Sequence, residues 1–143
     1  MTAVRVTTER FGDLDVAPDR ILTFPDALPG FTDAHRFVLV DVADNEWFFW
    51  LQSADDPSLA FLCANPWPFF PDYAPVVPDD DQTALELETA EDAMVLTIVT
   101  VNRDEQAITA NLLGPVVVNQ RTRVGRQVVL FSDEYPVQAP LVA

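Results

Sequence analysis

Apolar residues recur along the chain in short runs, many of which alternate with polar residues, and turn-forming residues separate the runs. The stretch 4–10 is rich in Val and Thr, Gly12-Asp13 marks a tight turn, and Leu14 and Val16 continue the alternation. Such a pattern is typical of short strands joined by hairpins. The same reasoning predicts strands over 4–10, 14–16, 21–24, 36–42, 47–52, 59–64, 94–101, 108–113, 116–119 and 127–131.

Helical signals are few. Residues 79–81 are three aspartates that follow Pro78, and they predict the start of a short helix because carboxylates favour a helix N-terminus. Residues 84–88 alternate and fit a strand equally well, so both possibilities stay open. The pattern as a whole predicts one small domain over residues 1–143, all-β and mainly antiparallel, a sandwich or barrel with at most one or two short helical turns.

One segment fits neither a strand nor a helix. Residues 64–75 read Ala-Asn-Pro-Trp-Pro-Phe-Phe-Pro-Asp-Tyr-Ala-Pro, with four prolines and four aromatics. Proline removes backbone donors and prevents regular helix, whereas aromatic rings are among the largest apolar groups that a protein buries. The segment therefore predicts a plug for one end of the core, a docking surface for a partner, or the edge of a ligand pocket.

Charge narrows the classes of partner. The chain has 143 residues, of which 49% are hydrophobic, and a formal net charge of −15. A sizeable core is therefore expected, and disorder is not. Phosphate groups are bound by Lys and Arg, so the negative charge argues against nucleic acid as a direct ligand and against an anionic membrane surface.

The acidic residues are concentrated in the middle of the chain. Between Arg36 and Arg103 there are thirteen acids and no basic residue. These acids form either a solvated surface that keeps the protein soluble or a face that attracts a basic partner.

Candidate catalytic and metal-binding residues are sparse. His35 is the only histidine and Cys63 the only cysteine, too few for a zinc site, and Cys63 is predicted to be a buried inert thiol. The four glycines lie too far apart for a phosphate-binding loop. We therefore expect no enzyme, no metal and no cofactor. Neither a secretory signal nor an apolar run of membrane-spanning length is visible, so we expect a cytoplasmic protein. We also expect a monomer.

Several longer motifs follow one another in order along the chain. They are Ile-Leu-Thr-Phe-Pro-Asp-Ala-Leu-Pro-Gly-Phe (21–31), Phe-Phe-Trp-Leu-Gln-Ser-Ala-Asp-Asp-Pro-Ser-Leu-Ala-Phe (48–61), Phe-Phe-Pro-Asp-Tyr (69–73), Thr-Ala-Asn-Leu-Leu-Gly-Pro-Val-Val-Val-Asn (109–119), Gly-Arg-Gln-Val-Val-Leu (125–130) and Tyr-Pro-Val (135–137). Together they resemble the FliW family of flagellar assembly factors, and the resemblance spans nearly the whole chain. It departs in the tail 137–140, where many members are more basic, and after Pro78, where a Leu-rich helical character is missing.

The resemblance implies a fold and a set of partners. The fold would be a small, mostly antiparallel β-barrel-like domain without catalysis. Family members bind flagellin in the cytoplasm and also bind CsrA, a small basic RNA-binding dimer that represses flagellin translation. Once export depletes flagellin, the released family member binds CsrA at a surface distinct from the RNA-binding surface of CsrA. The repression is then relieved allosterically. A rival expectation is a dedicated flagellin chaperone with no CsrA role.

Two groups of residues are the candidates for partner binding. In the first, Trp67, Phe70 and Tyr73 edge a groove, with Asp72 and the aspartates Asp79, Asp80 and Asp81 as its polar rim. The alternative for this segment is that Phe69 and Phe70 plug one end of a barrel. The second candidate is the pair Asp55 and Asp56, which serve either a partner or their own turn as caps of backbone amides.

Overall fold

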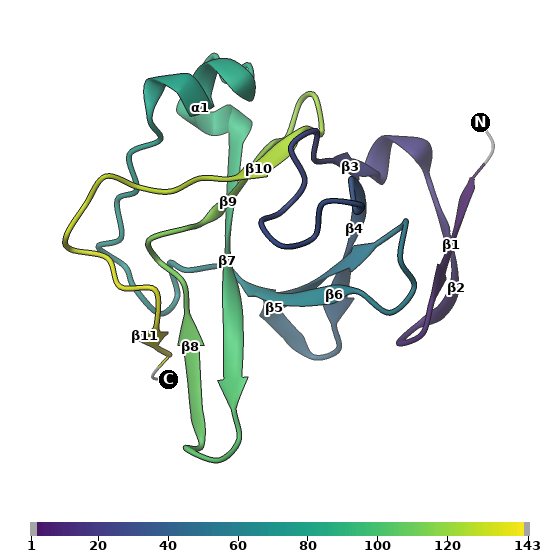
Figure 1. The fold of residues 1–143 in the computed structure, drawn as a ribbon, viewed down its shortest axis with the longest axis horizontal. Coiled ribbons are helices and arrows are strands. Elements are labelled where there is room, and N and C mark those ends of the chain that lie inside the picture. The colour runs from purple at the N-terminus through teal and green to yellow at the C-terminus, as the bar shows by residue number, and fades with distance from the viewer. Residues whose placement is uncertain (1–2, 142–143) are drawn as a thin grey trace.

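The computed structural model describes residues 3–141, and it confirms an all-β, mainly antiparallel chain (Figure 1). The strands are β1 (Val4–Thr8), β2 (Gly12–Val16), β3 (Leu22–Thr23), β4 (Arg36–Val42), β5 (Asn45–Ser53), β6 (Ala60–Ala64), β7 (Ala93–Asn102), β8 (Ala107–Ala110), β9 (Val116–Asn119), β10 (Gly125–Gln127) and β11 (Ala139–Pro140). Within the described residues there is one α-helix, α1 (Asp79–Ala84), and there are 3-10 turns at Pro18–Arg20 and Ala90–Asp92.

The strand β7 is the hub of the main sheet. Its first half pairs with β9, its centre with β6 and its second half with β8, and all of these pairings are antiparallel. The sheet therefore runs in the order β10-β9-β7-β6-β5-β4-β3, and β8 carries β11 on its far side. The strand expected over 94–101 is confirmed, and the structure places it at the centre of the sheet.

A continuous ladder does not close this sheet into a barrel. The two ends of the strand order, β3 and β10, meet through one isolated parallel bridge between Thr23 and Val124. The Thr23 N–H donates to the Arg123 carbonyl at 2.9 Å. The ends of the sheet thus touch, but the closed barrel that the family resemblance implied is not shown.

Two hydrophobic cores share the strand β9. Val116 and Val118 pack into a first core with Phe24, Phe37 and Leu51. Val117, which points the other way, packs into a second core with Tyr73, Leu85, Leu112 and Val128. Because successive side chains of a strand point to opposite faces, a strand between two cores must be apolar throughout. That requirement explains the uninterrupted valines of β9.

Several predicted boundaries were wrong. The two possibilities left open after Pro78 are decided: the helix start at 79–81 is confirmed, and residues 84–88 form no strand, because the chain turns at Glu86 with a positive φ of 54° after α1 ends. The strand predicted over 21–24 is only Leu22–Thr23, since Phe24 enters a turn. The strand predicted over 127–131 is assigned only as Gly125–Gln127, and the one predicted over 108–113 ends at Ala110.

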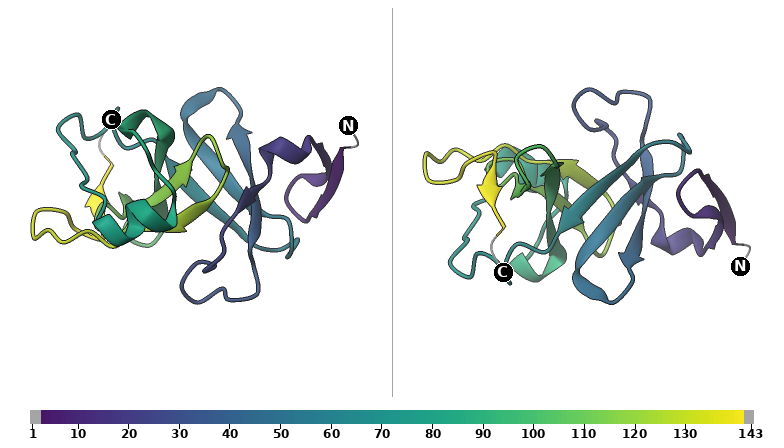
Figure 2. Two further views of the ribbon diagram at one scale, coloured as in Figure 1. Left: turned by 90° about the horizontal axis from the view of Figure 1, so that it is seen from above. Right: turned by 90° about the horizontal axis from the view of Figure 1, so that it is seen from below.

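The termini lie at opposite ends of the molecule. Figure 2 shows the β1–β2 hairpin at one end, set apart from the main sheet, and the last strand, β11, at the other. The hairpin forms its own two-stranded sheet. It is attached in part through Trp50, which stacks beneath the Arg10 guanidinium at 4.0 Å and meets the Phe11 ring edge-on.

Candidate functional site

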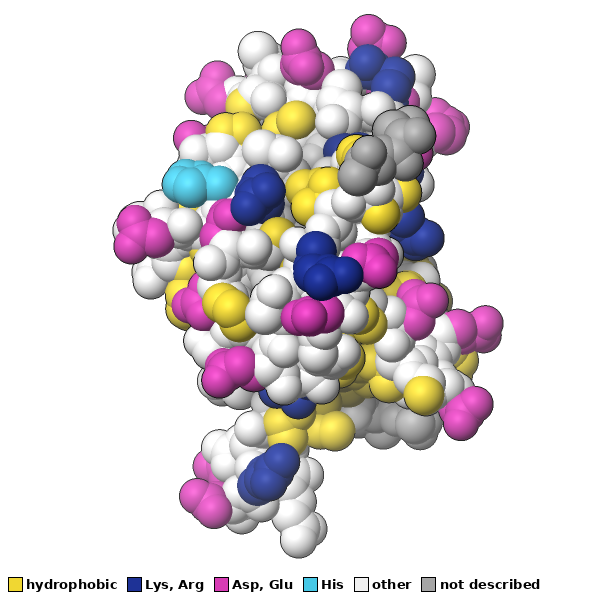
Figure 3. Space-filling model, turned by 90° about the vertical axis from the view of Figure 1, so that its right-hand side faces the viewer, with side chains coloured by type: hydrophobic (Ala, Val, Ile, Leu, Met, Phe, Trp, Pro, Cys, Tyr) yellow, Lys and Arg dark blue, Asp and Glu magenta, His cyan; other side chains and the backbone are white. Residues whose placement is uncertain are grey.

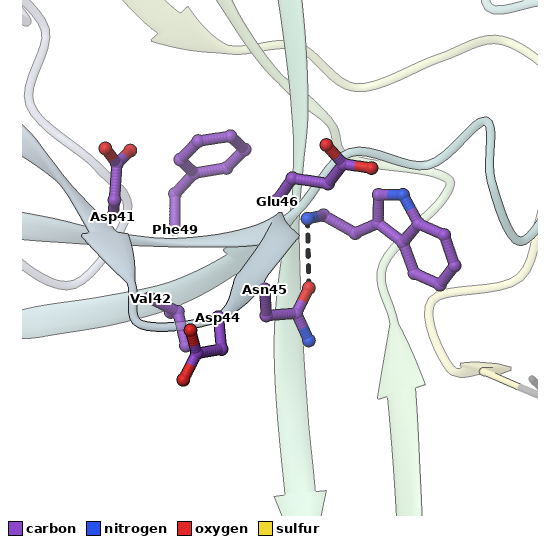
Figure 4. Close-up of a pocket in the computed structure, with 7 residues that line it drawn as sticks. Asp41, Val42, Asp44, Asn45, Glu46 and Phe49 are labelled. Carbon is purple, nitrogen blue, oxygen red and sulfur yellow. Dashed lines mark hydrogen bonds between the residues drawn. The ribbon is translucent and has the colours of Figure 1, made fainter.

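The β4–β5 hairpin ends in a hollow that the sequence analysis did not single out. The hollow has a volume of about 750 Å³ and lies beside the Asp44-Asn45 turn. It is lined by Asp41, Val42, Asp44, Asn45, Glu46, Trp47 and Phe49. Figure 4 shows that Asp41 and Phe49, which are cross-strand partners, rise from the same side of the hairpin, while Asp44 points to the other side.

The carboxylates of this hollow are not neutralised. Asp41, Asp44 and Glu46 take part in none of the ion pairs found among residues 3–141. The turn itself is built by Asp44, which adopts a positive φ of 60°, and by Asn45, whose Oδ1 accepts from the Trp47 N–H at 3.0 Å. We call this acidic and aromatic feature the hairpin hollow.

The proline–aromatic segment packs against the same hairpin. After β6 ends, the Asn65 N–H donates to the Trp47 carbonyl at 2.8 Å. The Phe69 ring then meets the rings of Trp47 and Phe48 edge-on, with centroids 5.5 and 5.7 Å apart. Phe69 therefore packs on the first residues of β5. Trp47 keeps 41% of its surface exposed beside it.

The other half of the segment faces the second core. Trp67 is 39% exposed, and its indole N–H donates to the Tyr73 carbonyl at 2.9 Å. Phe70 is half-buried against the second core. Tyr73 is buried: its hydroxyl donates to the Leu112 carbonyl, and burial, followed by the neighbouring Tyr135, raises the pKa of its hydroxyl.

The candidate residues on this segment consequently divide by exposure. Trp67 and Asp72 are at the surface, Phe70 is partly so, and Tyr73 anchors the segment from below. The free protein does not present Tyr73 at the edge of a groove. A role in partner binding is untested for all four, and Trp67 and Asp72 are the ones that a partner can reach directly.

Asp55 and Asp56 lie elsewhere: Asp55 holds the start of β4, and Asp56 organises its own turn through Ser58. Asp55 Oδ2 accepts from the backbone N–H groups of His35 and Arg36, each at 2.9 Å, and Oδ1 receives the Arg36 guanidinium at 2.9 Å. Partial burial raises the pKa of Asp55, but these hydrogen bonds and the Arg36 charge outweigh it, so the pKa lies below its ordinary value. The Ser58 hydroxyl and then the Ser58 N–H lower the pKa of Asp56.

The three aspartates of α1 form a third location. Asp79 and Asp80 are exposed, whereas Asp81 pairs with Arg126, which also reaches Asp26, at 3.3 Å in both cases. The helix is fixed to the β9–β10 hairpin, because the Asn119 amide donates to the carbonyls of Leu85 and Glu86. The structure thus brings Trp67, Phe70, Asp72 and Tyr73 together and leaves the other five candidates in two separate places.

Charge is dispersed on one end of the molecule. Figure 3 shows that end, where acidic side chains are spread over the face with arginines between them and do not form a single patch. This distribution suits a solvated acidic surface, whereas the hairpin hollow combines unpaired carboxylates with the exposed ring of Trp47. The signal in the sequence was the Asp44-Asn45 turn followed at once by Glu46 and Trp47.

The single cysteine and the single histidine have structural surroundings. Cys63 is fully buried, and burial raises its pKa to about 12, which disfavours the reactive thiolate. His35 Nδ1 lies 3.0 Å from the Phe24 carbonyl. Among residues 3–141 no cluster of three His, Cys, Asp or Glu side chains has the geometry to hold a metal ion. No helix of that range is long and apolar enough to cross a membrane.

Comparisons with known proteins agree on one family. The model of the FliW protein family matches residues 5–141. The chain is 37% identical over 139 residues to the flagellar assembly factor FliW of Natranaerobius thermophilus, covering 96% of this chain and 92% of that one. It is 35% identical over 136 residues to the protein of that name from Bacillus licheniformis, covering 95% of each. A crystal structure of the flagellar assembly factor FliW superposes with a TM-score of 0.88 at 31% identity, over 98% of both chains.

Proposed function

The chain belongs to the FliW family, and from that premise we propose that it is a non-enzymatic flagellar assembly factor that binds flagellin and CsrA in the cytoplasm. The names of its relatives support a role in flagellar assembly. In the proposed cycle, flagellin occupies the protein while flagellin is abundant. Once flagellin has been exported, the free protein binds CsrA and lowers the affinity of CsrA for RNA allosterically. Flagellin translation is thereby restored.

The observation that carries the CsrA half of the proposal is the hairpin hollow. A basic partner is attracted by carboxylates that have no cation of their own, and Asp41, Asp44 and Glu46 are of this kind. The exposed ring of Trp47, which lines the same hollow, adds an aromatic anchor of the kind that dominates binding energy at interfaces. A guanidinium or ammonium group would meet both a carboxylate and an aromatic face there.

The firmness of this surface also supports binding. The Trp47 ring packs against Phe69, which belongs to a segment whose prolines limit its freedom and whose backbone is hydrogen-bonded to Trp47 and Tyr135. A surface that is ordered before the partner arrives loses less entropy on association. The second candidate function is a flagellin chaperone without a CsrA role. In that case the carboxylates of the hollow would bind no partner and would only keep the protein soluble.

Calorimetry separates the two functions. The purified protein is titrated into flagellin and into CsrA from the same organism, at low and at high salt. The proposal expects both to bind, CsrA binding to weaken as salt rises, and flagellin bound beforehand to block CsrA. Binding of flagellin alone would support the chaperone function. Salt-independent CsrA binding would remove the electrostatic part and leave the aromatic rings as the main contact.

A further inference from the structure

The strand that begins with β10 continues past its assigned end without a change of register. Gly125 lies opposite Val118 in β10 and β9. Three residues on, the Val128 N–H donates to the Pro115 carbonyl, and the Leu130 N–H donates to the Leu113 carbonyl, both at 2.9 Å. The chain from 125 to 130 is therefore one extended edge strand, although Pro115 supplies no reciprocal donor.

The outer side of this edge strand is open over its second half. N–H groups alternate between the two sides of a strand, so Val129 and Phe131 direct theirs away from the sheet. No acceptor for either N–H occurs within residues 3–141. At the start of the strand the outer side is covered, because Thr23 bonds to the Arg123 carbonyl. The bridge between Thr23 and Val124 is the last backbone pairing on that side among the described residues.

The exposed face of the same stretch is apolar. Val128 and Leu130 are buried in the second core, whereas Val129 is 63% exposed and Phe131 91% exposed. Natural proteins protect an edge strand with a charged residue, a proline or a covering element. From 127 to 132 the sequence Gln-Val-Val-Leu-Phe-Ser contains neither a charge nor a proline. An edge of this kind is suited to accept a further strand.

We propose that the open edge from Gln127 to Phe131 takes up an extended segment of flagellin as an added β-strand. That the segment belongs to flagellin rests on the function proposed above. The properties that the segment must have follow from the edge itself. The free backbone groups at Val129 and Phe131 require an extended chain that pairs with them. Side chains on alternate positions of that chain would be apolar, because they cover the two exposed side chains.

Charge at the end of the edge fixes a further feature of the segment. Asp133 and Glu134 follow the edge directly, both are exposed, and neither forms an ion pair within the described residues. We therefore expect a basic residue at the end of the segment that lies beside them. A second copy of this chain is the less suitable occupant, because each copy carries a net charge of −15 and the two would repel.

Amide hydrogen exchange, followed residue by residue by NMR, tests the assignment. In the free protein the N–H groups of Val129 and Phe131 should exchange fast, and saturating flagellin should slow both by about tenfold or more, as new cross-strand hydrogen bonds form. Flagellin that binds by calorimetry but leaves both exchange rates unchanged would overturn the inference and leave the proposed function standing. No binding at all would overturn both. Protection that appears without flagellin and grows with protein concentration would assign the edge to a second copy and overturn the inference.

Substitutions give an independent test. Val129→Pro removes the free donor and Val129→Lys places a charge on the edge, and each should weaken flagellin binding by about tenfold. Val76→Lys is the matched control, since Val76 is 78% exposed and lies outside the edge. Melting curves identify variants that fold. Should Val129→Pro fail to fold, Val129→Lys decides, and equal flagellin affinities for Val129→Lys and Val76→Lys would contradict the assignment.

Discussion

The hydroxyl of Tyr73 donates a 2.7 Å hydrogen bond to the carbonyl of Leu112, which lies 39 positions further along the chain. The same ring meets Tyr135 edge-on, with centroids 4.8 Å apart. The proline–aromatic segment is thus held from beneath by the strand connection that precedes β9 and by the C-terminal segment. The exposed rings of the segment owe their position to a residue that is itself hidden.

Replacing Tyr73 with Phe should destabilise the fold by about 1–3 kcal/mol, because the buried Leu112 carbonyl loses its donor and gains no water. Urea unfolding measures the change. Tyr135→Phe is the matched control: the Tyr135 hydroxyl accepts from the Ala74 N–H at 3.1 Å in a more exposed setting, so the loss there should be smaller. Equal losses for the two variants would show that the Leu112 bond has no special weight.

Trp47→Ala should weaken CsrA binding about tenfold or more, since exposed aromatic anchors contribute most to interfaces. Phe31→Ala is a close control. Phe31 is 40% exposed and Trp47 is 41% exposed, and each packs edge-on against one phenyl ring, Phe61 and Phe69 respectively. Calorimetry on both variants decides. The hairpin hollow is not the CsrA surface if Phe31→Ala weakens binding as much as Trp47→Ala.

Neutralising the turn of the hollow should reduce the salt dependence of CsrA binding. In the double variant Asp44→Asn and Glu46→Gln two charges are removed, and asparagine still tolerates the positive φ of position 44. Asp104→Asn with Glu105→Gln removes the same charge from the exposed β7–β8 turn. The slope of affinity against salt should flatten for the first pair and stay near that of the parent for the second. Equal slopes would indicate that net charge alone steers the partner.

Asp55→Asn should cost about 1–2 kcal/mol of stability at pH 7, because a carboxylate holds three hydrogen bonds from His35 and Arg36. The pKa of Asp55 is lowered in the folded state, so its contribution is complete above the ordinary value of 3.8 and disappears as pH falls through the folded value. The stability gap between parent and variant should therefore close in acid. Unfolding curves from pH 7 downward measure it, with Asp80→Asn as an exposed control. A gap that stays the same from pH 7 into acid where the parent carboxylate is protonated would contradict this role.

Much of the fold follows from patterns that are local in sequence. Alternation and turn residues predicted the strands β4, β5, β7 and β9 close to their observed bounds, and the aspartates after Pro78 predicted the start of α1. Errors occurred where long-range packing decides. Phe24 continues an apolar run in the sequence, yet it turns into the first core to meet Phe37, at a ring distance of 5.2 Å.

The surface was harder to predict than the strands. The sequence does not show which of several neighbouring aromatic residues is buried. The fold buries Tyr73, half-buries Phe70 and exposes Trp67, because each contacts different residues. Trp47 joins them only through the pairing of β5 with β6, which brings it to Phe69. The sequence pattern of neither segment predicts the contact between Trp47 and Phe69. The use of Asp55 as a cap for His35 and Arg36, 20 and 19 positions away, is equally a product of the fold.

The separate β1–β2 hairpin gives the molecule a weak point. An isolated two-stranded sheet is only marginally stable in water. The β1–β2 hairpin therefore depends on its contacts with the rest of the fold, including those of Arg10 and Phe11 with Trp50. It should detach in brief openings while the rest of the fold stays intact. A protease would then cut first in residues 9–20, and the tryptophan fluorescence of Trp50 would report each release before global unfolding begins.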